Sequence, residues 1–247
     1  MRSYAIGDIH GHLDKLQALH ALIAADRALV GDGDAPIVHV GDLVDRGPES
    51  RGVVEYLRAG LAAGKNWVVL KGNHDRMFAG FLRDQHDHDP RLRADLSWLH
   101  PKLGGAATLA SYGVVNPGDR PIPLVWVDAV AAVPSSHRIF LETLPVLFRR
   151  GDTAFVHAGI KPGVALDNQV EDDLVWIRDA FLTDQRNHGP LIVHGHTVVD
   201  QATHCGNRVN IDSGAAYGGP MTAVVIEGRN VWQLSGSGRV PLVPIRA

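Results

Sequence analysis

The sequence contains almost no cysteine. Cys205 is the only one among 247 residues, so no disulfide can form within the chain. A single thiol is typical of a protein from a reducing compartment, and we therefore expect a cytoplasmic location. We also expect no secretory signal peptide, because the first predicted strand begins at Tyr4, directly after Met1 to Ser3.

Long apolar runs and an excess of one charge are also missing. No apolar stretch approaches the roughly 20 residues that a membrane-spanning helix needs, so we expect no membrane partner. The 24 Lys and Arg residues against 27 Asp and Glu give a net charge of −3, which predicts no basic surface for nucleic acid. Without an internal repeat or linker, residues 1–247 are expected to form a single domain. The unusual feature is the 14 histidines.

Three short phrases place polar residues after apolar runs. They are GDIHG (Gly7 to Gly11), GDLVDRG (Gly41 to Gly47) and GNHD (Gly72 to Asp75). The runs before them, Tyr4 to Ile6, Ile37 to Val40 and Trp67 to Leu70, are typical of buried strands. One Gly-Asp after a strand is ordinary turn chemistry. Three in succession, at the strand ends where open α/β sheets carry their active sites, predict a functional site.

Helices alternate with these strands in the first 80 residues. Leu13, Leu16, Leu19 and Ile23 recur at helical spacing, and a second helix is expected to open at Pro48. Its buried face is predicted to comprise Val53, Val54, Leu57 and Leu61. This order predicts parallel strands with right-handed crossovers.

The rest of the chain is expected to be helical and irregular at first, and then to return to strands. Residues 76–150 carry few motifs, and the polar stretch from Arg83 to Arg93 is predicted to be a solvent-exposed loop or helix turn. Later strands are expected at Thr153 to His157, Leu191 to His194 and Arg208 to Ile211. Met221 to Ile226 and Asn230 to Leu234 predict an antiparallel hairpin.

The polar residues of the phrases suit two metal ions. Asp8 and His10 lie two residues apart on an extended segment, so they can bind one ion together. Asp42 can bridge to a second ion, for which Asn73 offers a neutral oxygen. His157 and His196, each after a later strand, would complete the second site. Carboxylate, amide and imidazole ligands without thiolate favour two divalent ions such as Mn, Fe or Zn.

Two such ions would produce a bridging hydroxide near neutral pH and neutralise phosphate charge. The leaving oxygen then needs a proton, and His74 lies beside the ligand Asn73. Asp45 is placed to accept a hydrogen bond from the other ring nitrogen of His74. Arg46 and Arg178 can each form paired hydrogen bonds with phosphate oxygens.

Each residue taken alone has a simpler interpretation. An isolated Asp8 or Asp42 more often caps a loop, and an isolated His157 more often lies buried against a backbone partner. Arg178 fits equally well on a helix surface, in an ion pair. We interpret His86 and His88 as part of a solvated polar loop, and His204 and Cys205 receive no role. The combination and order of the motifs favour the metal site.

The motifs together resemble a known family, the phosphoprotein phosphatase branch of the metallophosphoesterases, and in particular its bacterial and lambda-phage-type serine/threonine phosphatases. The matching residues run nearly end to end: GDIHG, GDLVDRG, GNHD, HAG (His157 to Gly159), HGH (His194 to His196) and IDSG (Ile211 to Gly214). The resemblance implies an α/β (α+β) calcineurin-like fold, with a central β-sandwich flanked by helices.

The resemblance also implies roles for individual residues. One metal would be held by Asp8, His10 and Asp42, and the other by Asp42, Asn73, His157 and His196. His74 would be the general acid with Asp45 behind it. Arg46 and Arg178, with Asn73 beside them, would bind phosphate. His194 would contact the substrate or the ligands.

Two substrates are compatible with this family. Symmetrical diadenosine tetraphosphatases share most of the motifs, but they typically have alanine at the position of Asp45. Asp45 therefore favours a serine/threonine phosphoprotein phosphatase, possibly of dual specificity for phosphotyrosine, as the main prediction. Hydrolysis of a dinucleoside polyphosphate is the alternative, and a metal-free phosphate-binding module is a third hypothesis that the complete ligand set disfavours.

Overall fold

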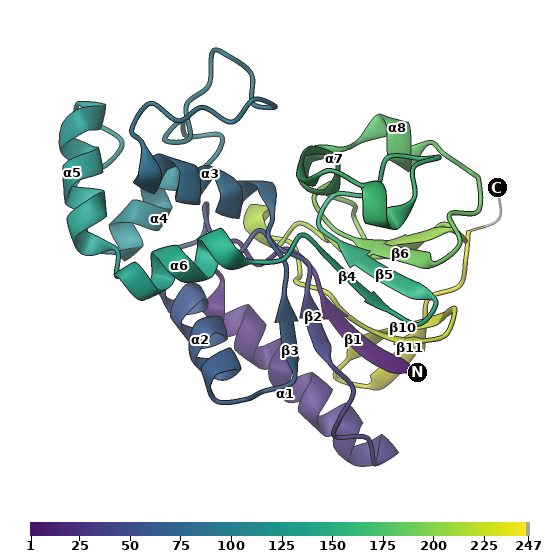
Figure 1. Ribbon diagram of the computed structural model, residues 1–247. Coiled ribbons are helices and arrows are strands. Elements are labelled where there is room, and N and C mark those ends of the chain that lie inside the picture. The colour runs from purple at the N-terminus through teal and green to yellow at the C-terminus, as the bar shows by residue number, and fades with distance from the viewer. Residues whose placement is uncertain (246–247) are drawn as a thin grey trace.

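The computed structural model describes residues 1–245, and its core is formed by two mixed β-sheets with helices outside them (Figure 1). This is the fold class expected from the sequence. The first sheet has the order β11-β10-β9-β1-β2-β3, and the second has the order β4-β5-β6-β8-β7. The eight α-helices in this part of the chain include α3 to α6, which gather on one side of the view, and α7 and α8, which lie on the other.

The strands of the first sheet are β1 (Arg2–Ile6), β2 (Ile37–His39), β3 (Trp67–Val69), β9 (Ala223–Glu227), β10 (Asn230–Ser235) and β11 (Gly238–Pro241). Those of the second are β4 (Leu147–Arg150), β5 (Thr153–Val156), β6 (Leu191–His194), β7 (Thr203–His204) and β8 (Arg208–Asn210). The helices are α1 (Leu13–Val30), α2 (Ser50–Ala62), α3 (Asn73–Arg83), α4 (Gly105–Ser111), α5 (Ile122–Ala132), α6 (Ser135–Thr143), α7 (Glu171–Trp176) and α8 (Asp179–Leu182). Short 3₁₀ turns occupy Leu166–Asn168 and Ala215–Tyr217.

The parallel arrangement predicted for the first 80 residues is confirmed. Strand β1 pairs in parallel with β2, and β2 pairs in parallel with β3. The predicted C-terminal hairpin is also present, because β9 and β10 are antiparallel. Strand β9 pairs with the other edge of β1, so the C-terminal hairpin completes the sheet that the N-terminal strand begins.

Side chains of β1 alternate between two hydrophobic cores. Tyr4 and Ile6 point into the core that the first sheet shares with the helices. Ala5, between them, points into a second core with Phe155 and Val193 of the other sheet. This alternation is what a strand buried on both faces requires. The second core packs the two sheets face to face, so the loops that follow their strands converge at one end of the molecule.

Helix α2 begins later than predicted. Its first helical residue is Ser50, two positions after Pro48. The backbone N–H of Glu49 donates to the carbonyl of Gly11, which delays the first turn. The helix buries Val53, Val54 and Leu57 as predicted, but Leu61 is 36% exposed because it lies on the last turn.

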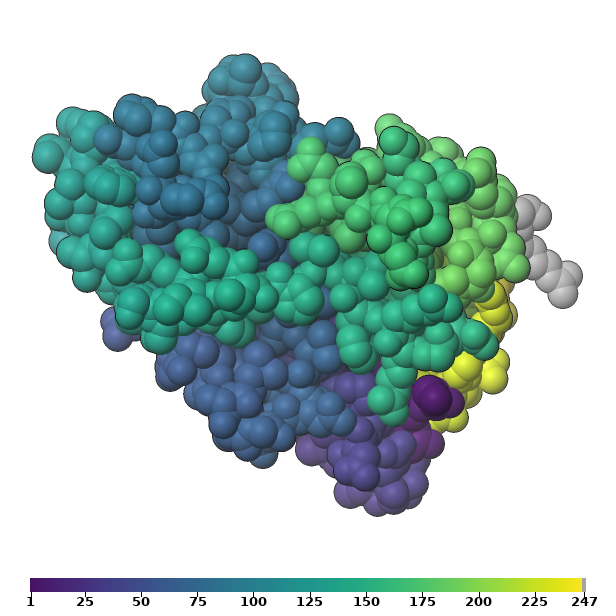
Figure 2. Space-filling model, viewed as in Figure 1, coloured from purple at the N-terminus to yellow at the C-terminus, as the bar shows by residue number. Residues whose placement is uncertain are grey.

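The polar stretch after α3 is a mostly exposed loop, as predicted, with Asp89 as its one buried residue. Asp89 is buried, and both of its carboxylate oxygens accept hydrogen bonds from the Arg76 guanidinium of α3. The same guanidinium donates to Asp172 of α7 at 2.7 Å. Arg76 therefore joins the blue-to-teal helical region of Figure 2 to the green region that carries α7. Asp89 is the exception because its partner on α3 was not visible in the local pattern.

Among residues 1–245, no single helix combines the length and apolar character needed to cross a membrane. Helices α5 and α6 pass this composition test only as a pair, and they are bent by 98° relative to each other.

Candidate metal centre and active site

The predicted site residues come together where the strands of both sheets end. Asp8 and His10 follow β1, Asp42 follows β2, and His157 and His196 follow β5 and β6. Asn73 and His74 form the first turn of α3, immediately after β3. All seven of these side chains are buried. Convergence of the strand ends thus brings together residues that are up to 188 positions apart.

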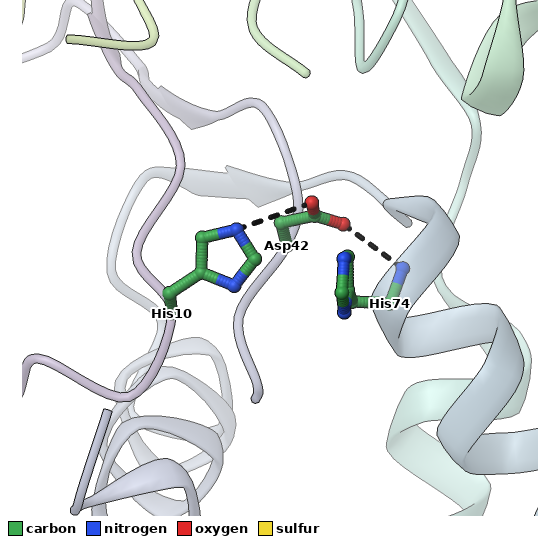
Figure 3. Close-up of side chains that lie close together, drawn as sticks. All are labelled: His10, Asp42 and His74. Atoms are coloured by element: carbon green, nitrogen blue, oxygen red, sulfur yellow. Dashed lines mark hydrogen bonds and ion pairs between the residues drawn. The ribbon is translucent and has the colours of Figure 1, made fainter. Parts of the chain in front are cut away.

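His10, Asp42 and His74 form the first group that could hold a metal ion (Figure 3), with one ligand atom from each lying within 4.8 Å of the others. His10 Nε2 lies 3.4 Å from Asp42 Oδ2. The other ring nitrogen, Nδ1, is 2.8 Å from the Val44 carbonyl and donates to it. This contact assigns the proton to Nδ1 and leaves the Nε2 lone pair directed into the site.

Asp42, His157 and His196 form the second group within the same distance limit. His157 donates from Nδ1 to the carbonyl of Val40 at 2.9 Å, which again directs Nε2 inward. That Nε2 lies 3.3 Å from Asp42 Oδ1 and 2.9 Å from Asn73 Oδ1. The predicted second ligand set is therefore clustered, and Asp42 is the residue shared by both groups.

The role of Asp8 as a ligand of the first ion stays a prediction, and the structure places its carboxylate beside His196. Its carboxylate accepts a hydrogen bond from the backbone N–H of His196 at 3.1 Å. It belongs to neither of the two groups found among the described residues. Gly195 is required here, because a Cβ at that position would overlap the Asp8 carboxylate. Asp8 therefore contacts the second group through His196. Like His10 of the first group, it follows β1.

Burial and neighbouring charges shift the pKa of the carboxylates and histidines of the site. Burial, together with Asp212 and Asp42 nearby, raises the pKa of Asp8 well above its usual range. Burial also raises the pKa of Asp212 to about 6. Burial acts in the same direction on Asp42, but the histidines around it, His157 foremost, hold its pKa below the usual range. Burial lowers the pKa of His10 and His196, and the Asp42 carboxylate opposes this shift in both.

The backbone at the site is strained. Six non-glycine residues in the described chain have positive φ, and five of them are His10, Asp42, Asp45, Arg46 and His196, with φ between 44° and 75°. Left-handed conformations cost energy for residues with a Cβ, so they persist where surrounding structure enforces them. Their concentration here indicates that the positions of these side chains are maintained despite strain in the backbone.

The contact expected between Asp45 and His74 is present. Asp45 Oδ2 accepts a hydrogen bond from His74 Nδ1 at 2.6 Å. The same oxygen accepts from the indole N–H of Trp98 at 2.8 Å, and Oδ1 accepts from the Thr108 hydroxyl at 2.7 Å. Asp45 is fully buried, so this network fixes its carboxylate and, through it, the ring of His74.

The two candidate phosphate-binding arginines differ in their surroundings. Arg46 places its guanidinium against Nε2 of His10 and, at 3.0 Å, against Nε2 of His74. Arg178 is exposed and donates to the Thr197 hydroxyl at 3.3 Å. Its positive charge lowers the pKa of His157 and His196 in addition to the effect of burial, so it lies within electrostatic reach of the site.

The residues present fit two divalent cations. His196 Nε2 is buried and has no hydrogen-bond partner among the described residues. The Arg46 guanidinium already lies against the His10 lone pair, which shows that this position accepts a positive group. Neutral imidazoles, Asp42 and the Asn73 oxygen are ligands for Mn, Fe or Zn. Bound there, such ions would supply Lewis acidity and activate water.

Several residues of the site were not assigned from the sequence. Asp212 lies in the IDSG motif after β8, and its position directly after a strand was a signal that could have identified it. Trp98 and Thr108 lie in the segment before α4 and in α4 itself, where no motif marks them. His194 is buried with Nε2 unpartnered among residues 1–245, and its Nδ1 contacts the Gly195 carbonyl. His86, His88, His204 and Cys205 lie outside both groups.

The sequence is similar to proteins named as bis(5'-nucleosyl)-tetraphosphatases. The chain is 26% identical over 243 residues to the asymmetrical bis(5'-nucleosyl)-tetraphosphatase PrpE of Anoxybacillus flavithermus, covering 89% of this chain and 88% of that protein. It is 31% identical over 164 residues to the symmetrical bis(5'-nucleosyl)-tetraphosphatase of Nitrosococcus oceani, covering 66% of this chain and 45% of that protein.

Solved structures share the fold. A putative diadenosine tetraphosphatase aligns with a TM-score of 0.61 at 22% identity, covering 97% of this chain and 93% of that one. A cold-active protein-tyrosine phosphatase of a psychrophilic Shewanella aligns with a TM-score of 0.57 at 16% identity, covering 98% of this chain and 80% of that one. The sequence model of the calcineurin-like phosphoesterases matches residues 1–223. The chain therefore belongs to the calcineurin-like phosphoesterase family and is a metallophosphoesterase hydrolase.

Proposed function

We propose that the protein hydrolyses dinucleoside polyphosphates such as diadenosine tetraphosphate. The observation that carries this proposal is the pair of relatives named as bis(5'-nucleosyl)-tetraphosphatases, one of which matches along most of both chains. The geometry supports it, because buried carboxylates and imidazoles suited to two cations lie beside two arginines. This arrangement suits the highly charged phosphate chain of such a substrate.

The protein's own residues have distinct roles in this proposal. Asp42, His10, Asn73, His157 and His196 hold the cations, with Asp8 beside His196. Arg46 and Arg178 then bind phosphate oxygens and orient the bond to be broken.

Protonation of the leaving oxygen falls to His74. Asp45 holds its Nδ1, so Nε2 faces the site and can deliver a proton. Arg46 lies against that Nε2, so it can bring a phosphate oxygen within reach of the acid. Water adds to one phosphorus atom and releases a proton to the solvent, while the phosphoanhydride P–O bond breaks and the departing phosphate oxygen takes the proton from His74. His74 then regains a proton from the solvent, so no net proton is lost from the protein.

Hydrolysis of phosphoserine or phosphothreonine in proteins is the second candidate. The observation favouring it is Asp45, a position at which symmetrical tetraphosphatases typically have alanine, and Asp45 contacts His74 in the structure. This contact serves either substrate equally, since both reactions need a proton on a leaving oxygen. We therefore give more weight to the relatives than to this one residue.

A direct competition experiment tests the proposal. The protein, loaded with Mn²⁺, is incubated with diadenosine tetraphosphate and a phosphothreonine peptide at equal concentrations, and products are separated by chromatography. We expect nucleotide products to form with a higher kcat/KM than inorganic phosphate from the peptide. Two ADP molecules would indicate symmetrical cleavage, and ATP with AMP would indicate asymmetrical cleavage. Exclusive peptide hydrolysis would overturn the proposal.

Variants of the site residues distinguish hydrolysis at this site from hydrolysis by a contaminating enzyme. Asp42→Asn removes a charge shared by both ligand groups and should abolish hydrolysis of every substrate. His74→Asn should lower turnover while metal content, measured by atomic emission, changes little. His86→Asn is a matched control because His86 lies outside both groups. Equal activity of the wild type and Asp42→Asn would show that this site does not catalyse the reaction.

A further inference from the structure

A second depression in the surface opens beside the predicted phosphate site. It has a volume of about 740 Å³ and begins at Arg46. Tyr217 forms part of its wall, Lys102 and Asp119 contribute charge, and small residues line it at Ala106 and Gly118. A volume of this size is in the range of small-molecule sites. We call it the Tyr217 groove.

The tyrosine connects the groove to the phosphate site. The Arg46 guanidinium carbon lies 5.1 Å from the centre of the Tyr217 ring. The same guanidinium contacts His10 and His74, so the ring is separated from the catalytic histidine by one side chain. Tyr217 is nevertheless 65% exposed. A large aromatic ring that is this exposed to solvent and that lies next to a cation is positioned to contact a ligand.

The turn that carries Tyr217 is held firmly in place. Lys15 of α1 donates to the carbonyls of Ala215 and Gly219, at 3.3 and 2.9 Å. The Gly219 N–H also donates to the Gly214 carbonyl at 2.9 Å. The exposed ring is therefore presented from a fixed backbone, which lowers the entropic cost of binding a flat partner.

We propose that the Tyr217 groove binds the nucleoside of the leaving nucleotide, with its base stacked on Tyr217 and its phosphate next to Arg46. This inference rests on the proposed function, since it assigns a place to a group that only a nucleotide substrate carries. Base stacking on an aromatic side chain tolerates any base, whereas the charged neighbours favour a ligand with both phosphate and polar groups.

The chemistry of the lining supports a nucleoside over a peptide side chain. Lys102 lines the groove and forms no side-chain hydrogen bond or ion pair within residues 1–245, so its ammonium group is available to a phosphate of the ligand. Asp119 can accept hydrogen bonds from ribose hydroxyls or an exocyclic amine. The small side chains at Ala106 and Gly118 leave room for a planar ring to lie flat.

The test compares two ligands that differ by a nucleoside. AMP and inorganic phosphate are measured as competitive inhibitors of p-nitrophenyl phosphate hydrolysis by the Mn²⁺-loaded protein. We expect AMP to bind more tightly than phosphate. Tyr217→Ala should weaken AMP about tenfold and phosphate much less, and Tyr217→Phe, which keeps the ring, should retain most of the AMP affinity.

A second variant avoids removing the aromatic ring. Gly118→Leu fills the groove, and a Cβ there meets only Ala106, at 3.7 Å, so the fold should tolerate it. It should also weaken AMP selectively. Gly33→Leu is the matched control, because Gly33 lies on an open loop with no atom near its Cβ position. The control should leave both inhibition constants unchanged.

The outcomes separate this inference from the proposed function. If diadenosine tetraphosphate is cleaved but AMP binds no more tightly than phosphate, or neither variant affects AMP, the nucleoside groove is wrong while the function stands. If AMP binding depends on Tyr217 but no dinucleoside polyphosphate is cleaved, the groove stands and the proposed function is wrong.

Discussion

Trp98 donates its indole N–H to the same Asp45 oxygen that accepts a hydrogen bond from His74, at 2.8 and 2.6 Å. Trp98 is buried, so we expect it to act by positioning Asp45. Trp98 lies in the segment before α4. The helical region between α3 and β4 is therefore linked to His74 through the buried contacts of Trp98 with Asp45 and of Asp45 with His74. We therefore expect the region between α3 and β4 to position the proposed general acid as well as to shape the surface.

Trp98→Phe should therefore lower kcat without changing KM. The substitution keeps an aromatic ring against Phe78 but removes one hydrogen bond to a buried carboxylate, which predicts a loss of roughly tenfold in kcat. The pH profile of kcat should also shift, because the charge on Asp45 is less well compensated. Steady-state kinetics from pH 5 to 9 measure both. Trp126→Phe, on α5, is the control and should behave as the wild type. An unchanged pH profile with a lower melting temperature would indicate a purely structural role.

His74→Asn and Asp45→Asn should both reduce kcat, by about 10²- to 10⁴-fold for His74. Asparagine in place of His74 cannot donate a proton with comparable acidity, and Asp45→Asn removes the acceptor for Nδ1. A substrate with a better leaving group needs less protonation, so the loss should be smaller for p-nitrophenyl phosphate than for an alkyl phosphate. Equal losses on both substrates would argue against His74 as the acid.

Much of the site could be predicted from the sequence, because its ligands lie in short motifs after strands. Asp42, His157 and His196 form one group as expected, and His74 meets Asp45. The contact of Asp8 with the His196 N–H could not be predicted, since it depends on the packing of one sheet against the other.

Strands β1, β2 and β3 were predicted because each is a short apolar run followed by a turn motif. Strands β4, β7 and β11 were missed, because they are short and partly exposed and have no such pattern. Trp98, Thr108 and Tyr217 were missed for another reason. Their partners lie more than 50 residues away in sequence, and a local pattern carries no information about such contacts.

Removing the metal ions should destabilise the protein. The buried carboxylates of Asp8, Asp42 and Asp212 raise one another's pKa or depend on nearby histidines, so loss of two cations leaves them uncompensated. An excess of chelator should lower the melting temperature by about 5 to 10 °C, as expected for ligands present well above their dissociation constants. Differential scanning calorimetry with and without added Mn²⁺ measures this. Asp42→Asn should show a smaller chelator effect, and an equal effect would place the ions elsewhere.

Gly60→Ala in α2 should destabilise the protein, although alanine normally stabilises a helix by up to about 1 kcal/mol. A Cβ at Gly60 would overlap the indole ring of Trp67 on β3. Displacing that ring disturbs its packing on His20 and Tyr56, so the steric cost exceeds the gain in propensity. At Gly52, in the same helix, a Cβ meets the flexible end of Leu13 at 3.0 Å and lies in ordinary contact with Glu49 at 3.8 Å, so Gly52→Ala is the matched control. Urea unfolding of the two variants should move the midpoint down for Gly60→Ala only.

Stability should fall as the pH decreases from 7 to 4, partly because of a buried histidine pair. His20 and His39 share a hydrogen bond between their Nε2 atoms at 2.9 Å. Burial lowers the pKa of His39 from its ordinary 6.5 to about 3 and that of His20 to about 4. In the unfolded chain both bind protons below pH 6.5, whereas in the folded protein they stay neutral until about pH 4. The unfolded state therefore gains protons first, and stability is lost as the pH falls through this window.

His39→Leu should reduce this pH dependence. Each buried histidine contributes a slope of up to about 1.4 kcal/mol per pH unit, so removing one should make the unfolding free energy less steep between pH 6 and 4. Urea denaturation at several pH values measures the slope. Although the variant also loses the His39 contact to the Val68 carbonyl, that loss lowers stability equally at each pH and leaves the slope comparison valid. An unchanged slope would show that His39 is protonated in the folded protein at this pH.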